Sequence, residues 1–186
     1  MALPITQFTL PLPKLSNRQF AWDCGVLFLA IFWLGGSLIL DLVVMPMLYM
    51  SGMMTAPGFA SAGYSLFELF NHVEMLLSGL ILTGVLAMRQ QPTEGAIEVS
   101  GSRSRWALML AIGLVAIALI YAYVLTPYMG ALGIALDLPG IIHIVPTTMG
   151  WMHGTYWLLE STKVLLLGGL LSLCYGDIAA QFSDRA

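Results

Sequence analysis

Four long apolar segments, separated by shorter polar or proline- and glycine-rich stretches, dominate this chain. They cover residues 25–44, 66–87, 107–125 and 155–174. Each is close to the ~20 residues that an α-helix needs to cross the hydrocarbon core of a bilayer. Because lipid offers no hydrogen-bonding partner to the backbone, a spanning segment of this kind has to be helical. The pattern predicts an all-α protein, a bundle of four transmembrane helices.

The connections between these segments predict how the helices are grouped. Residues 90–104 form the one conventionally polar connection, and it divides the bundle into two helical hairpins. The other two connections are apolar and broken by proline and glycine, which predicts short, partly helical pieces packed over the outer mouth of the bundle. We expect an N-terminal cytoplasmic or interfacial tail (1–21), a single membrane domain (22–177) and a C-terminal tail (178–186). The expected helices are about 24–44, 64–88, 106–125 and 149–175.

The basic residues predict the orientation of the bundle. Both outer connections lack lysine and arginine, whereas the tails and the polar connection carry Lys14, Arg18, Arg89, Arg103, Arg105 and Arg185. Basic residues accumulate on the cytoplasmic side of membrane proteins. Both termini are therefore predicted to be cytoplasmic.

The composition agrees with a lipid environment and excludes several functional classes. The chain is 59% hydrophobic and 9% charged, against about 25% charged residues in a typical soluble domain. A net charge of −3 leaves no basic footprint for nucleic acid. There is also no Rossmann or P-loop glycine pattern. No enzymatic reaction is indicated, and the partner that the composition requires is the bilayer itself.

Polar residues recur inside the second and fourth apolar segments. Charged side chains at such depths cost at least ~2.5–3.5 kcal/mol each, so they face the protein interior or a wet cavity. The second and fourth helices should therefore contact each other or line one cavity together, with Lys163 neutralising Glu160 or Glu74. The predicted polar network, read from helical spacing and from depth, consists of Asp41, Glu68, Asn71, Glu74, Tyr156, Glu160 and Lys163.

A first hypothesis for these residues is a metal or haem site near the outer face. Thioether sulfur and imidazole suit copper(I), and imidazole also suits haem iron. His72 and His153 are the candidate cofactor ligands, and Glu68 is one turn from His72, where it could orient the ring. The candidate metal ligands are His72, His153, Met45, Met47 and Met149, although methionines also serve simply as adaptable apolar packing.

Two other hypotheses need no metal. In one, the protein is a non-enzymatic subunit or assembly factor whose charges dock a partner membrane protein or a second copy. In the other, it is a small proton- or solute-coupled transporter, with a path through Glu68, His72, Glu74, Glu160 and His153. Polar residues become scarce in the cytoplasmic half, where the candidates are Ser78, Thr83 and Ser172.

The two hairpins also show a faint internal repeat. Pro46 and His72 are separated by 26 residues, as are Pro127 and His153, and the two pairs are offset by 81 positions. Each hairpin thus has a proline that is predicted to end its first helix and a histidine early in its second helix.

The fourth helix carries a motif that resembles a known family. Met152-His153-Gly154 followed by Glu160, together with the glycine-rich first helix that runs to Pro46, is similar to the transmembrane-protein-205-like (DUF4149-type) group. In that group asparagine follows the histidine at seven residues, where this chain has Glu160. The resemblance implies four membrane helices, no established enzyme activity, and a bacterial or cyanobacterial member in an inner or thylakoid membrane.

Overall fold

The computed structural model describes residues 17–53, 56, 58–89, 100–136 and 147–183, and within this part of the chain it contains helices and no strand. Four helices are long and apolar enough to cross a membrane, which confirms the predicted all-α, four-helix architecture. The predicted N-terminal tail and the polar connection fall largely outside the described residues, whereas residues 178–183 of the predicted C-terminal tail are a continuation of the fourth long helix. The elements are α1 (Asn17–Ile39), η1 (Leu40–Val44), α2 (Met45–Met50), α3 (Phe59–Arg89), α4 (Ser100–Ile120), η3 (Tyr121–Leu125), α5 (Thr126–Leu136) and α6 (Thr147–Ser183).

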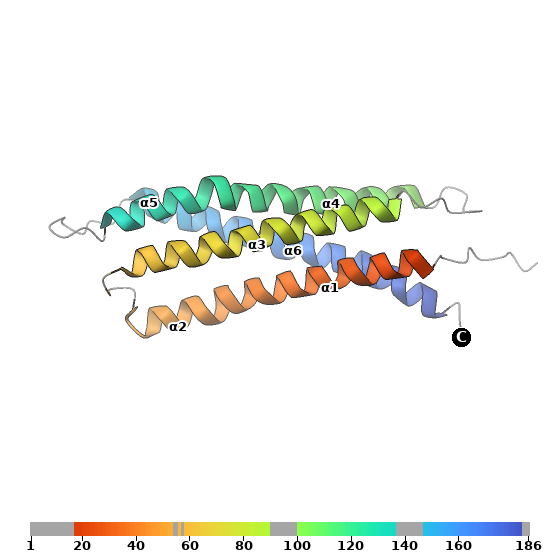
Figure 1. Cartoon of the computed structure of the whole chain (residues 1–186), viewed down its shortest axis with the longest axis horizontal. Helices are drawn as coiled ribbons and strands as arrows, with labels where there is room; N and C mark the ends of the chain where they lie inside the picture. The colour runs from red at the N-terminus through yellow and green to blue at the C-terminus, as the bar shows by residue number, and fades with distance from the viewer. Residues whose placement is uncertain (1–16, 54–55, 57, 90–99, 137–146, 184–186) are drawn as a thin grey trace, which may run out of the picture.

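The four long helices form a bundle in which chain neighbours do not always face each other. Helix α1 packs against α3 and α6, and α4 packs against the same two helices. Consequently α1 and α4 stand at opposite corners, as do α3 and α6. Figure 1 shows α1 beginning and α6 ending at the same end of the bundle, which we call the terminal end; the opposite end is the α2–α5 end.

One π-helical turn interrupts the first helix of each hairpin. In η1 the Met45 N–H bonds to the Leu40 carbonyl, and in η3 the Thr126 N–H bonds to the Tyr121 carbonyl, both five residues back. Proline follows one residue later in each case. Proline removes a backbone donor and crowds the carbonyl four residues earlier, and the wider π turn lets the chain pass this point and remain helical.

These turns correct the expectation that Pro46 and Pro127 end their helices. The first helix continues through α2 to Met50, and the third through α5 to Leu136, beyond the predicted ends near residues 44 and 125. The π turns begin at Leu40 and Tyr121, which have the same offset of 81 residues as the two prolines. The faint sequence repeat therefore corresponds to a repeated backbone irregularity.

The two extensions at the α2–α5 end differ in how they pack. Helix α5 lies close against α3, where a Cβ atom on Gly130 would come within 2.1 Å of the Tyr64 ring. Helix α2 is largely exposed, with Tyr49 and Met50 turned outward. Among the described residues, α5 is thus packed into the bundle at this end, whereas α2 is mostly exposed.

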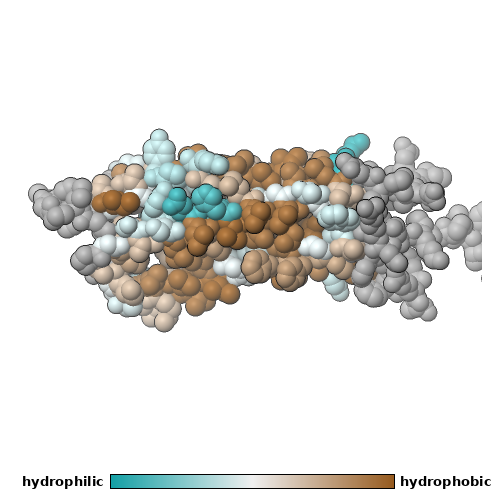
Figure 2. Space-filling model, viewed as in Figure 1, coloured by the Kyte–Doolittle hydropathy of each residue, from teal (hydrophilic) through white to brown (hydrophobic). Residues whose placement is uncertain are grey.

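The apolar core occupies the half of the bundle nearer the terminal end. Val26, Ile81, Leu114 and Leu167 are completely or almost completely buried there. The outside of the bundle is also mostly apolar (Figure 2), as expected for helices that face lipid. Polar side chains collect in the bundle interior between this core and the α2–α5 end.

Candidate functional site

A buried lysine lies at the centre of the polar side chains. Lys163 stands near the middle of α6, about 25–30 Å from either end of the helix at ~1.5 Å per residue. Its side chain is 2% exposed, and its Nζ atom lies 2.5 Å from Glu74 Oε1 and 2.7 Å from Glu160 Oε2. The lysine therefore bridges two carboxylates, one on its own helix and one on α3 at the opposite corner of the bundle.

Glu74 is held from α1 as well as by the lysine. The Trp33 indole Nε1–H donates to Glu74 Oε1 over 2.8 Å, and the Ser37 hydroxyl donates to the same oxygen over 3.2 Å. Trp33 and Ser37 are spaced four residues apart, so both point from one face of α1. Three donors therefore converge on a single carboxylate oxygen and compensate its charge.

Glu160 has fewer donors. The Tyr121 hydroxyl donates to Glu160 Oε2 over 3.0 Å, and the Tyr121 ring lies beneath the lysine, 5.3 Å from Nζ to the ring centroid. Tyr121 is the first residue of η3, so the π turn presents this side chain to the bundle axis. The other π turn also supplies a network residue.

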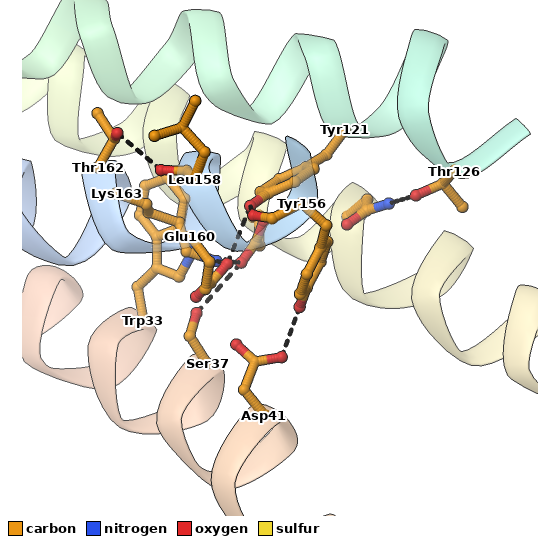
Figure 3. Close-up of polar contacts among 12 residues, drawn as sticks. Trp33, Ser37, Asp41, Tyr121, Thr126, Tyr156, Leu158, Glu160, Thr162 and Lys163 are labelled. Atoms are coloured by element: carbon orange, nitrogen blue, oxygen red, sulfur yellow. Dashed lines mark hydrogen bonds and ion pairs between the residues drawn. The ribbon is translucent and has the colours of Figure 1, made fainter. Parts of the chain in front are cut away.

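Asp41 is the second residue of η1 and lies at the edge of the network nearest the α2–α5 end. The Tyr156 hydroxyl donates to Asp41 Oδ1 over 2.5 Å (Figure 3). Asp41 is buried, and its carboxyl group is close enough to that of Glu160 for the two to interact electrostatically. Asp41 and Glu160 are thus neighbouring carboxyl groups, and the nearby cation, Lys163, is already paired with Glu74.

The resulting set is called the buried network below; its members are Trp33, Ser37, Asp41, Glu74, Tyr121, Tyr156, Glu160 and Lys163. It holds three carboxyl groups against one ammonium group, and Lys163 is the one buried cation among the described residues. Within that part of the chain, Glu74 Oε2 and Glu160 Oε1 are buried without a hydrogen-bond partner. The negative charge of the three carboxyl groups is therefore only partly compensated by Lys163 and by the neutral hydrogen-bond donors of the network.

A separate polar contact ties the network's helices together. The Asn71 side-chain amide donates to the Thr126 hydroxyl over 2.6 Å, linking α3 to the start of α5. Thr126 follows η3 directly. This bond fixes α3 against the π turn that carries Tyr121.

The sequence matches the model of one protein family. Residues 28–133 match the model of a domain of unknown function, DUF4149. The chain belongs to this family. The match runs from α1 into α5, so it includes Trp33, Asp41, Glu74 and Tyr121, and it ends before the α6 residues of the network. Searches of curated proteins and of solved structures find no match to the chain.

In this DUF4149 protein the two histidines that the structure describes, His72 and His153, lie outside the buried network. His72 and His153 are both exposed, and each ring places Nδ1 on the backbone carbonyl four residues earlier, that of Glu68 or Met149. The carboxylate of Glu68 is itself exposed, and its backbone carbonyl, not its side chain, orients His72. Figure 2 shows a hydrophilic patch on this part of α3.

The predicted metal ligands lie at exposed or partly exposed positions. Among the described residues, no three His, Cys, Asp or Glu side chains are arranged to hold a metal ion. Met47 is exposed, while Met45 and Met149 are partly exposed. The copper or haem hypothesis therefore gains no support from this geometry.

Three members of the network were not among the residues singled out from the sequence. Trp33, Ser37 and Tyr121 occur in apolar helices where aromatic and small side chains are expected as packing. One signal was available: a tryptophan in the middle of a membrane helix is far from the interface where this residue usually lies. Its buried N–H needs an acceptor, which pointed to an acidic partner.

Proposed function

We propose that this protein is a small proton-coupled membrane transporter whose buried network is the proton-binding group. The observation that supports this function is the excess of acid over base at mid-membrane depth: Asp41, Glu74 and Glu160 surround Lys163 alone. With the three carboxyl groups and the lysine ionised and both tyrosines neutral, the network would carry a charge of −2. Such a charge in low dielectric is strongly unfavourable, and taking up a proton relieves it.

A proton suits this environment better than a larger ligand does. The side chains already contact one another at hydrogen-bonding distance, from 2.5 Å for Tyr156–Asp41 to 3.2 Å for Ser37–Glu74. A proton can be added to a carboxylate without displacing these contacts. Intramembrane chains of acids and hydroxyl groups serve as proton relays in pumps and transporters.

The packing around the network supports exchange from one side in this conformation. Towards the terminal end the interior is mainly apolar, with Ile81 and Leu167 in the core, and the buried polar side chains there include Ser78 and Asp23. Towards the α2–α5 end lie Asp41 and Tyr156, beside the weakly packed α2. Transport then requires a second conformation, and the π turns at η1 and η3 are the irregular points at which the helices could bend.

Proton flux in reconstituted vesicles tests the proposal. Purified protein in liposomes containing a pH-sensitive dye is exposed to a proton gradient, with and without a protein-free extract of small solutes. We expect flux at least about tenfold above that of empty liposomes, abolished in Glu160→Gln. Glu68→Gln changes an exposed acid on α3 and serves as the matched control, which should retain the flux. Wild-type flux equal to that of empty liposomes under both conditions would refute transport.

The two other sequence hypotheses are less well supported. A metal or haem site would have to use histidines that point away from the network. Docking of a partner through Glu74, Glu160 and Lys163 conflicts with their burial, since these charges pair with each other inside the bundle. The geometry therefore favours the proton-coupled function.

A further inference from the structure

The acids of the buried network differ in how well their charge is compensated. Glu74 Oε1 accepts hydrogen bonds from Lys163, Trp33 and Ser37. Glu160 Oε2 forms an ion pair with Lys163 and accepts a hydrogen bond from Tyr121. Asp41 Oδ1 receives Tyr156, a neutral hydroxyl, and no described cation contacts this aspartate. Compensation thus falls steadily from Glu74 to Asp41.

The least compensated acid is also placed against a second acid. The Asp41 and Glu160 carboxyl groups are close enough to interact electrostatically inside the buried network, and Figure 3 shows both of them in the space between α1 and α6, with Asp41 on the Tyr156 hydroxyl. Two carboxylates at this separation repel strongly when both are ionised, so such pairs hold one proton between them. Glu160 Oε1 is buried without a hydrogen-bond partner among the described residues, so its charge is incompletely compensated.

We propose that Asp41 and Glu160 hold a single exchangeable proton between them, whereas Glu74 and Lys163 form a permanent ion pair. This assignment rests on the proposed proton-coupled function and names the site within it. On release, one carboxylic O–H bond breaks and a water molecule takes the proton. The network's charge changes from −1 to −2, with no oxidation or reduction.

The surrounding groups make this pair the exchange site. The ionisable groups that face it are Tyr156 and Lys163 from α6, Tyr121 from η3 and Glu74 from α3. Lys163 is already shared between two glutamates, so it cannot neutralise Asp41 as well. Asp41 is also the network acid nearest the α2–α5 end, because it lies in η1, directly before α2.

Infrared difference spectroscopy of the purified full-length protein tests the assignment. A step from neutral to alkaline pH should remove the carbonyl band of a protonated carboxylic acid, and that band should shift in D₂O. We expect the band in the wild type and in the control Glu68→Gln, and its loss in Asp41→Asn and in Glu160→Gln. Persistence of an unchanged band in both variants would overturn the assignment, as would its absence from the wild type.

A labelling experiment covers the case in which a variant fails to fold. Wild-type protein is produced in cells supplied with aspartate that carries ¹³C in its side-chain carboxyl group. Its carboxylic acid band should lie at lower frequency than that of unlabelled protein, because Asp41 contributes to the band. A band that does not move with this label would exclude Asp41. The vesicle assay is independent of the infrared experiment. A carboxylic acid band without proton flux would support the shared proton and refute the transport function. Proton flux without the band would support transport and refute the shared proton.

Discussion

At the scale of single residues, the decisive feature is one lysine serving two glutamates in the middle of a membrane helix. A buried ion pair recovers its desolvation cost when geometry and extra hydrogen bonds are good. Here Trp33, Ser37 and Tyr121 supply those extra bonds. The arrangement therefore has the features of a tolerated buried charge, and removing one partner leaves the others uncompensated.

We expect Lys163→Leu to lower the free energy of unfolding by about 3–5 kcal/mol, because Glu74 and Glu160 lose their common cation. Thermal or denaturant unfolding in detergent measures the effect. Thr162→Leu is the matched control, since Thr162 is exposed on the adjacent position of α6 and should change stability little. Adding Glu74→Gln to Lys163→Leu should restore part of the loss. Equal stability of Lys163→Leu and wild type would contradict the role of the ion pair.

At the scale of helices, the two π turns connect backbone irregularity to the site. Each precedes a proline, and each places a network side chain, Asp41 or Tyr121, on the bundle axis. A continuous α-helix would rotate the residues beyond the turn by about 100° relative to their present direction. The prolines therefore influence which residues of α2 and α5 face the bundle.

The close approach of α5 to α3 depends on Gly130. We expect Gly130→Ala to destabilise the protein by about 1–3 kcal/mol, because the added methyl group would overlap the Tyr64 ring. Gly154→Ala is the control: its Cβ meets nothing within 4 Å, so it should be neutral or stabilise by up to about 1 kcal/mol. Unfolding midpoints in detergent compare the two, and an equal response of both variants would show that α5 is not packed as described.

At the scale of the whole molecule, the two hairpins are arranged so that equivalent helices stand at opposite corners. Helices α1 and α4 contain the π turns, and α3 and α6 contribute the ion-pair partners Glu74 and Lys163. The network thus draws residues from all four corners of the bundle, and no single hairpin contains it.

The orientation in the membrane is testable by reporter fusions. A reporter inserted after Gly95, or fused after Ala186, should be active as a cytoplasmic protein, and one inserted after Thr55 should lie on the opposite side, because basic residues accumulate at the terminal end. An alkaline phosphatase and green fluorescent protein pair reads both sides. The reverse pattern would place the α2–α5 end, and with it Asp41 and Tyr156, towards the cytoplasm.

The sequence by itself determined the class of fold and much of the polar inventory. Apolar run length predicts four membrane helices for a physical reason, the fixed thickness of the bilayer. Helical spacing and the cost of intramembrane charge then turned Glu74, Glu160 and Lys163 inward. These inferences depend on local pattern and on the solvent, so no knowledge of packing was required.

Tertiary structure alone decided which polar residues meet. Local spacing placed His72 on the stripe that also carries Glu68 and Asn71, but in the bundle Asn71 is buried and His72 is exposed. Asp41 joined the network because a π turn in η1 and the position of α6 bring it to Tyr156. From the sequence, Trp33 and Tyr121 are ordinary packing residues, because their hydrogen-bond partners, Glu74 and Glu160, lie on other helices. Contacts across a bundle depend on how whole helices rotate and pair, and sequence spacing within one helix does not contain that information.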